Sequence, residues 1–449
     1  MRKLMIIFFC TLVLSAGGLV QAQTPNYNIR VFGYLNTWAL QMGAGVWGSS
    51  NYENMLYTNL DRSACTDYIT FNANFNTDGS MKMASDWYPS TGNTAWGQAY
   101  FQVPKRRFLN DWIHTTGQRV HICFFVGGDG AEWTAELASP TIRTAMIVTI
   151  RDSCIGTTNR YDGVVFDVEP LGTGDTANVR LFLKELRDTL NNYHQWADVS
   201  KKPEISICFF DQWNQSTYWA KVAAYVDNFQ HMSYNMMGNW ETISWYNEPV
   251  YSTGYTGNPP NVSSIDSYTA EFIANGIPRN KLVMASSFNY NAFQGGSTAG
   301  GEGCYAPLLT MTTYPTAMLY NTSGALVGYW SGSEDYYCLW NGFLDTSTTT
   351  HAYDATRQAA WGGVNVAGNT NDFIVIYQDT TTIKKILDYA SAQGLMGTMI
   401  WDLCGGYVNS PNQTRHPGLV ADHLLQAVKQ ERLVLASSTV SNRKYLFRK

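Results

Sequence analysis

Two carboxylates, Asp167 and Glu169, stand at the end of an apolar segment that reads Tyr-Asp-Gly-Val-Val-Phe-Asp-Val-Glu-Pro from position 161. Side chains alternate along a β-strand, so Val165, Asp167 and Glu169 would share one face, while the opposite face is wholly apolar. Burial and like charge raise the pKa of at least one carboxyl group in such a pair. The spacing therefore predicts a poised acid, whereas an arbitrary Asp-x-Glu more often caps a loop or forms a salt bridge.

The elements that must position this pair are eight short, β-rich runs with helical segments between them. They span residues 29–34, 68–72, 119–126, 163–168, 204–210, 229–234, 281–288 and 397–401. This alternation is typical of a parallel sheet, and the number eight predicts an α/β fold of the (β/α)8 TIM barrel type. Active sites in such barrels lie at the carboxyl ends of the strands, where we expect both carboxylates.

The remaining segments predict one large domain with additions. Residues 293–370, between the seventh and eighth runs, are rich in Gly, Thr, Tyr and Trp and show a helical period only over 353–361. A connection this long needs structure of its own, so we expect a small α+β insertion there. The barrel would then comprise residues 23–292 and 371–430 with a closing helix over 419–428, followed by a flexible basic tail over 431–449.

The amino terminus predicts export. Arg2 and Lys3 precede an apolar run that ends at a Val-Gln-Ala cleavage pattern, so residues 1–22 read as a signal peptide, and the run is short for a membrane anchor. We expect a secreted protein, or a periplasmic one in a bacterium. The formal net charge of −5 argues against nucleic acid as a partner. We also expect a monomer without a membrane partner.

The cysteines and histidines indicate neither a disulfide framework nor a metal centre. Eight cysteines include Cys10 of the leader, so an odd number remains after its removal. Cys123 and Cys208 lie in apolar runs and read as small buried residues, whereas Cys304 and Cys338 are the candidate disulfide. No spacing of Cys or His suggests a metal site, and no cofactor is expected.

Several motifs together resemble glycoside hydrolase family 18 over residues 29 to about 405. The family signature Asp-Gly-x-Asp-x-Asp-x-Glu is similar to residues 162–169, with one carboxylate missing. Further landmarks fall in the family's order: Phe-Gly-Tyr at 32–34 followed by Trp38, Phe-Val-Gly-Gly at 125–128, Met-Ser-Tyr-Asn at 232–235, Tyr-Gln-Asp at 377–379 and Gly-Thr-Met-Ile-Trp at 397–401. The resemblance implies a glycosidase acting on polymers of β-linked N-acetylglucosamine, such as chitin.

The resemblance also implies a role for each site residue in a retaining, substrate-assisted reaction. Glu169 would protonate the leaving oxygen, Asp167 would hold the acetamido N–H, and Tyr234 would bind the same acetamido group. Trp401 would form the floor on which the sugar stacks. Further substrate contacts would come from Tyr34, Trp38, Met232, Asn235 and Trp213. The alternative for Tyr234 and Trp401 is that they are ordinary core aromatics.

Three residues depart from the family pattern. Val165 replaces the deepest Asp, and Phe125 replaces a Ser, so an apolar pair stands where the family has a polar one. Without its partner, Asp167 should ionise more readily, which predicts activity with an altered acid limb. Asn235 replaces an Asp that would bind the acetamido region or the acid, which bears on pH optimum and substrate.

Aromatic residues make up 14% of the chain, with 15 Trp and 28 Tyr, more flat apolar surface than a core alone usually needs. About a third of the loop and insertion tryptophans would be sugar platforms; the candidates are Trp47, Trp87, Trp96, Trp213, Trp240, Trp245, Trp330, Trp340 and Trp361. Three functions remain open: a chitinase, an endo-β-N-acetylglucosaminidase on N-glycans or a peptidoglycan-cleaving relative, and a chitin-binding lectin without activity. Retention of Glu169 favours an enzyme over the lectin.

Overall fold

The computed structural model describes most of the chain, and every structural statement below refers to the described residues. These are 26, 28–36, 40–41, 55–82, 103–126, 131–169, 176–193, 202–210, 215–236, 245–253, 263–294, 317–320, 326–330, 333–335, 350–364, 373–410 and 419–446. The proposed signal peptide at 1–22 lies outside these residues.

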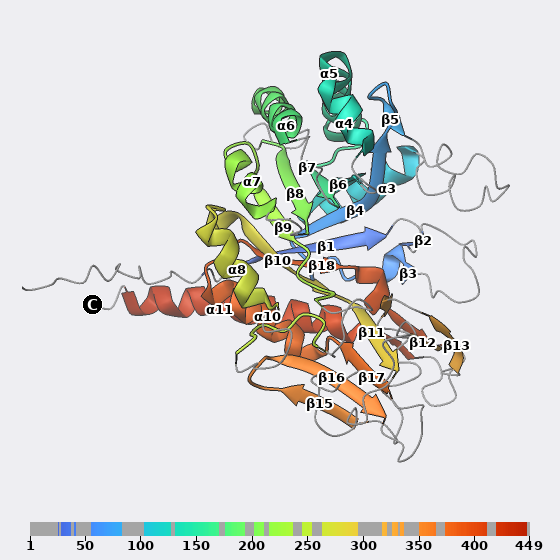
Figure 1. The fold of residues 1–449 in the computed structure, drawn as a ribbon, viewed down its shortest axis with the longest axis vertical. Coiled ribbons are helices and arrows are strands. Elements are labelled where there is room, and N and C mark those ends of the chain that lie inside the picture. The colour runs from blue at the N-terminus through green and yellow to red at the C-terminus, as the bar shows by residue number, and fades with distance from the viewer. Residues whose placement is uncertain are drawn as a thin grey trace, which may run out of the picture.

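Eight parallel strands form a closed barrel, which confirms the predicted fold class (Figure 1). They are β1 (Arg30–Asn36), β4 (Asp67–Phe75), β6 (Arg119–Val126), β7 (Gly163–Val168), β8 (Glu204–Phe209), β9 (Asn228–His231), β10 (Leu282–Ser287) and β18 (Gly397–Trp401). Around the barrel their order is β1-β18-β10-β9-β8-β7-β6-β4, and the pairing of β1 with β4 closes it. Each strand coincides with one of the eight predicted runs.

Helices surround the barrel on its outside (Figure 1). They are α3 (Val103–His114), α4 (Ala131–Ala138), α5 (Pro140–Thr149), α6 (Thr176–Asn191), α7 (Gln215–Val222), α8 (Ile265–Ala274), α10 (Thr380–Ala392) and α11 (His423–Leu446). Helix α6 illustrates the pattern, since Val179, Phe182, Leu183, Leu186 and Leu190 recur every three or four residues and are all buried. None of the described helices is both long and apolar enough to span a membrane.

The alternation of strand side chains produces two separate cores. Val164, Phe166 and Val168 of β7 pack into the outer core, between the barrel and its helices. Val165 points the other way, into a cluster that we call the barrel interior. The members of the barrel interior are Phe32, Tyr34, Ile69, Phe71, Cys123, Val165, Cys208, Val283, Ala285 and Met399.

The insertion between β10 and β18 contains an antiparallel sheet of five strands, lower in Figure 1. In sheet order these are β14 (Ser333–Asp335), β11 (Asn289–Gln294), β17 (Phe373–Tyr377), β16 (Ala359–Val364) and β15 (Thr350–Asp354); β12 (Ala317–Tyr320) and β13 (Leu326–Trp330) form a separate hairpin. Strands β11 and β17 extend the unit beyond the expected limits of 293 and 370. The described residues of the expected α+β insertion form strands, and residues 353–361, for which a helical period was expected, are part of a hairpin.

The carboxyl-terminal helix α11 continues further than expected. Residues 419–421 form strand β20, which pairs with β19 (Val408–Ser410), and α11 then runs from His423 to Leu446. Residues 431–446 are therefore helical, although the sequence predicted a flexible tail. Leu435 is still buried against the core, and Arg432 Nε donates a hydrogen bond to the Ala64 carbonyl at 3.1 Å, so packing continues past residue 430.

Short elements complete the chain between the larger ones. They are strands β2 (Leu40–Gln41), β3 (Met55–Leu56) and β5 (Met81–Lys82), 3-10 turns at Tyr57–Asn59, Arg279–Lys281 and Leu403–Gly406, and a π-helical turn at Ile150–Ile155.

Candidate active site

The two carboxylates lie at the carboxyl end of β7, as predicted. Asp167 shares the inward face of β7 with Val165 and is only 3% exposed, whereas Glu169 follows the strand and is partly exposed. The strand register aligns Asp167 with Phe125 of β6 on one side and with Cys208 of β8 on the other. The pair is thus held by the middle of three adjacent barrel strands.

Burial raises the pKa of both carboxyl groups. For Asp167 the loss of solvent has the largest effect, and the negative charge of Glu169 raises its pKa further. For Glu169 burial also raises the pKa, and a hydrogen bond from Asp167 opposes part of that rise. The pair therefore keeps a proton at pH values at which isolated carboxyl groups would have lost it. We expected Asp167 to ionise more readily; its apolar surroundings raise its pKa instead.

Val165 fills the space beneath Asp167 with apolar contacts. It is fully buried in the barrel interior, together with Ile69, Phe71 and Cys123. Phe125 packs edge to face on Phe71, with ring centroids 5.8 Å apart. The apolar pair predicted from the sequence is therefore part of a continuous apolar layer.

Cys208 is a neighbour of Asp167 that the sequence did not identify as polar. Its burial is confirmed, but its thiol donates a hydrogen bond that lowers the pKa of Asp167 against the larger effect of burial. Burial and the charge of Asp167 raise the pKa of the Cys208 thiol, and a hydrogen bond with Tyr34 opposes that rise. A thiol thus takes part in the environment of the carboxylate pair. The only signal in the sequence for this contact was the side-chain alternation along β8, which turns Cys208 toward the barrel interior.

Tyr234 and Met232 lie beyond the end of β9 and close to the carboxylates. Burial raises the pKa of the Tyr234 phenol well above its ordinary value, and the charges of nearby groups, including Asp167 and Glu169, raise it further. The phenol therefore remains a neutral hydroxyl that can donate a hydrogen bond. Met232 packs against the barrel interior and is partly buried. The structure thus brings Tyr234 to the carboxylate pair.

Trp401 ends β18 and is supported by two aromatic rings. It is partly exposed and meets Tyr34 and Phe71 edge to face, with ring centroids 5.5 Å and 4.8 Å apart. Tyr34 is 1% exposed, and its hydroxyl donates to Gln230 Oε1 at 3.0 Å. Tyr34, which we expected to contact substrate, therefore lies behind Trp401 and supports it.

Asn235 lies next to Tyr234 and is partly exposed, with a φ of 51°. Its Oδ1 accepts a hydrogen bond from Asn291 Nδ2 at 3.0 Å. This amide links the candidate site to strand β11 of the inserted sheet.

Glu248 is a second buried acid that the sequence did not single out. It is fully buried, and its carboxyl oxygens accept the Ser287 N–H at 3.0 and 2.9 Å. Burial raises its pKa well above the ordinary value, although these hydrogen bonds oppose the rise. Its charge is one of those that raise the pKa of Tyr234, so it lies near the site. No motif in the sequence marks this loop position.

Several predicted residues lie outside the described part of the chain. They are Trp38, Trp213, Trp47, Trp87, Trp96, Trp240 and Trp340, the cysteines Cys304 and Cys338, and the side chain of Trp330. Trp245 and Trp361 are described, and both are buried. Trp245 Nε1 donates to the Ser263 carbonyl at 3.0 Å, so this ring has a packing role.

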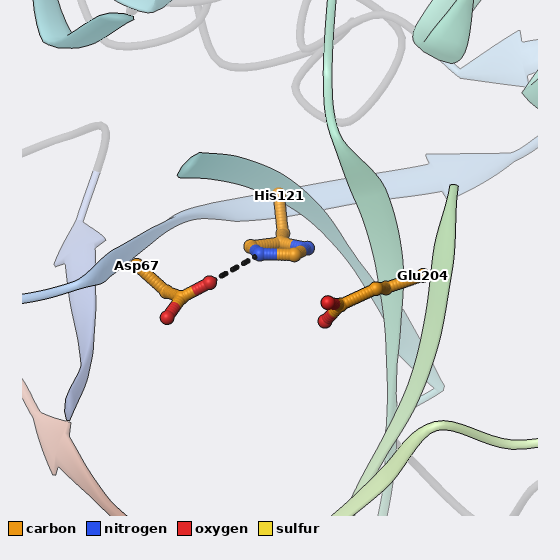
Figure 2. A group of neighbouring side chains, drawn as sticks. All are labelled: Asp67, His121 and Glu204. Atoms are coloured by element: carbon orange, nitrogen blue, oxygen red, sulfur yellow. Dashed lines mark hydrogen bonds and ion pairs between the residues drawn. The ribbon is translucent and has the colours of Figure 1, made fainter. Parts of the chain in front are cut away.

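One group of described residues resembles a metal-ligand set, and it lies at the end of the barrel opposite to the carboxylate pair. Asp67, His121 and Glu204 hold their ligand atoms within 4.8 Å of one another, and Figure 2 shows them converging. Arg30 already pairs with Asp67 at 2.6 Å and with Glu204 at 2.8 Å, and Arg119 Nε lies 2.9 Å from Asp67.

Those arginines hold the pKa of Asp67 well below its usual range, although burial alone would raise it. Two guanidinium groups already neutralise the two carboxylates, so the cluster is suited to stabilising the amino end of the barrel and not to binding a metal cation. Since Asp67 and Glu204 begin their strands, this ionic cluster lies far from Glu169.

Comparisons with known proteins agree with these features. The family model described as "Glycosyl hydrolases family 18" matches residues 30–406. Chitinase A1 from Niallia circulans is 24% identical over 364 residues, which cover 77% of this chain and 48% of that protein. The chain therefore spans about half the length of this relative.

Solved structures share the fold. The group IV chitinase of Ostrinia furnacalis has a TM-score of 0.68 at 16% identity, covering 90% of this chain and 100% of that one. Human YKL-39, described as a pseudo-chitinase with retained chitooligosaccharide binding properties, has a TM-score of 0.65 at 16% identity, covering 90% and 99%. At these identities the likeness concerns the fold alone.

Proposed function

Because the chain belongs to glycoside hydrolase family 18, we propose that it is a secreted hydrolase that cleaves β-1,4-linked N-acetylglucosamine polymers, with Glu169 as the general acid. The observation that carries this proposal is the Asp167–Glu169 pair at the carboxyl end of β7, in which loss of solvent raises the pKa of both carboxyl groups. A carboxyl group whose pKa is raised keeps its proton to a higher pH than an isolated carboxyl group and can donate it to a leaving oxygen.

The proposed first step uses the substrate's own acetamido group as nucleophile. Its carbonyl oxygen attacks the anomeric carbon while Glu169 transfers a proton to the departing glycosidic oxygen, which gives an oxazolinium ion and a free chain end. In the second step Glu169 takes a proton from water, which attacks the same carbon and reopens the ring. The configuration is retained after two inversions.

Asp167 is suited to hold the acetamido N–H and to balance the charge of the ion. Its Oδ1 is buried and has no hydrogen-bond partner among the described residues, so this oxygen can accept a hydrogen bond from a ligand. Tyr234 supplies a neutral hydroxyl for the same group. Trp401 offers a partly exposed ring, backed by Tyr34, on which the sugar can stack.

A binding-only function is the second candidate, because one observation favours it. The apolar layer at Val165 and Phe125 removes polar partners from Asp167, and the fold is shared with YKL-39, which is described as a pseudo-chitinase. Retention of Glu169 argues for catalysis, since a site that only binds sugar has no need of an acid there.

The experiment compares product release from colloidal chitin and from a high-mannose glycopeptide across a range of pH. We expect wild type to release N-acetylglucosamine oligomers from chitin and Glu169→Gln to lose about 10²–10⁴-fold in rate. Asp188→Asn, which removes an exposed carboxylate on α6, is the matched control and should remain active.

Release from the glycopeptide alone would identify an endo-β-N-acetylglucosaminidase. Binding of chitin by wild type without cleavage of either substrate would leave the binding-only function.

We also propose export with removal of residues 1–22, and a monomeric enzyme that takes neither nucleic acid nor membrane as a partner. The leader pattern and the net charge of −5 support these proposals. Amino-terminal sequencing of protein recovered from the medium, together with its mass in solution, tests them.

A further inference from the structure

The Asn235 amide is held in one orientation. An amide side chain has an acceptor end, the oxygen, and a donor end, the NH2 group. Asn291 Nδ2 donates to Asn235 Oδ1 at 3.0 Å, so the acceptor end of Asn235 faces the inserted sheet. The donor end is the part that the Asn235 side chain can present to a ligand beside Tyr234.

Asn291 is itself fixed by a second hydrogen bond. It lies on β11, is 5% exposed, and its Nδ2 also donates to Asn247 Oδ1 at 2.8 Å. Both N–H groups of this amide are therefore used on oxygen acceptors. Asn247 Nδ2 in turn donates to Ser287 Oγ at 2.9 Å, so a flip of either amide would break two hydrogen bonds.

Glu248 anchors the far end of this chain of hydrogen bonds. Its carboxyl group accepts the Ser287 N–H and the Ser286 hydroxyl, the latter at 3.2 Å, and thereby ties the loop after β9 to the end of β10. Ser287 Oγ lies 3.5 Å from Glu248 Oε1, so its hydrogen is directed there while its lone pair faces Asn247. Hydrogen bonds are thus donated from Asn291 through Asn247 and Ser287 to Glu248, the final acceptor, and from Asn291 to Asn235 on the other side.

We propose that the inserted sheet, acting through Asn291, determines which end of the Asn235 amide meets the sugar, so that the NH2 group donates to an acceptor oxygen of the bound N-acetylated sugar. This inference rests on the proposed function. An ionised Asp, which the family pattern has at this position, would offer acceptors only. Asn291, Asn247 and Glu248 are accordingly positioning residues for substrate specificity.

The test measures binding of an N-acetylglucosamine oligomer by calorimetry, with Glu169→Gln as the background to prevent cleavage. Asn291→Ala frees the Asn235 amide to rotate, and we expect the Kd to rise about two- to five-fold. Asn291→Asp places an acceptor against Asn235 Oδ1 and drives the amide to turn its oxygen toward the sugar, so the Kd should rise at least about ten-fold.

Asn289→Ala is the matched control, because Asn289 shares the face of β11 and its Oδ1 has no hydrogen-bond partner among the described residues. It should leave the Kd unchanged. Thermal unfolding of each variant shows whether it is folded. If Asn291→Asp does not fold, the comparison of the Kd of Asn291→Ala with that of Asn289→Ala tests the inference by itself.

Equal affinity of Asn291→Ala and Asn289→Ala would overturn the inference, as would a loss that is no larger for Asp than for Ala. A background protein that binds no oligomer, together with a wild type that cleaves none, would instead refute the proposed function, and the inference with it.

Discussion

The Asp167–Glu169 pair was predictable from the sequence because side-chain alternation turns Asp167 inward on β7, and Glu169 follows directly after the end of that strand. Their neighbours were not, since the contacts join distant parts of the chain. Cys208 meets Asp167 only through the register of β7 and β8, and Glu248 bonds Ser287, which lies 39 residues further along the chain. Tyr34 has the right position in the motif, but the sequence did not show that it is buried and packs against the Trp401 ring.

At the same scale, Val165→Asp tests whether the barrel interior is specifically apolar. A carboxyl group at this fully buried position would have no cation beside it in the barrel interior, so we expect the free energy of unfolding to fall by about 2–4 kcal/mol. Adding Phe125→Ser supplies a hydroxyl on the adjacent strand. The double variant should therefore lose less stability than the sum of the two single variants.

Urea unfolding of the four proteins gives this comparison, with Val165→Ala as a control for lost volume. Additive losses would show that the two positions do not act as a pair.

At the scale of elements, the barrel strands were predictable because most of them are nearly continuous apolar runs, as expected for strands buried on both faces. The inserted sheet was not predictable in the same way. Its strands are short, and it is their antiparallel pairing, such as that of β17 with β11 and β16, that defines them. The apolar spacing over 353–361 is compatible with a helix, but Tyr353 pairs with Ala360 across a turn. The sequence predicts too short a closing helix, because the residues after 430 are mostly polar. Single packed residues there, such as Leu435, do not stand out in the composition.

The loop anchored by Glu248 predicts a pH effect on stability. The pKa of this carboxyl group is raised on folding, so the folded state binds the proton more tightly than the unfolded state. The stability that it contributes is complete below the unfolded pKa of about 4.3 and is lost as pH rises toward the folded pKa.

Glu248→Gln keeps an oxygen for the Ser287 N–H and cannot ionise. We therefore expect the variant to gain stability relative to wild type as pH rises above the unfolded pKa of about 4.3, as measured by urea unfolding. A difference that stays constant with pH would show that Glu248 is already charged in the folded protein.

At the scale of the whole molecule, the groups that stabilise the barrel and the groups of the candidate active site lie at opposite ends of the strands. The ionic cluster of Asp67, Glu204, Arg30 and Arg119 closes the amino end, while the carboxylate pair lies at the carboxyl end. Asp67→Asn removes one buried charge and leaves its arginine partners underneutralised. We expect a loss of about 3 kcal/mol at pH 7.

Since the folded pKa of Asp67 is depressed, this stability is fully present above the ordinary Asp pKa of about 3.9, declines as pH falls below it and is lost only as pH passes through the folded pKa. The gap between wild type and Asp67→Asn should therefore shrink at pH 3. The KM for a soluble oligomer at pH 7 should not change, and a large change in KM would contradict the separation of the two ends.

The most direct test of Glu169 as the general acid uses leaving groups that differ in their need for a proton. kcat/KM would be measured for wild type and Glu169→Gln on an N-acetylglucosamine oligomer and on its dinitrophenyl glycoside, whose leaving group departs without protonation. We predict a loss of about 10²–10⁴-fold on the oligomer and a much smaller loss on the dinitrophenyl glycoside. Equal losses on both substrates, or none on either, would contradict the assignment of Glu169.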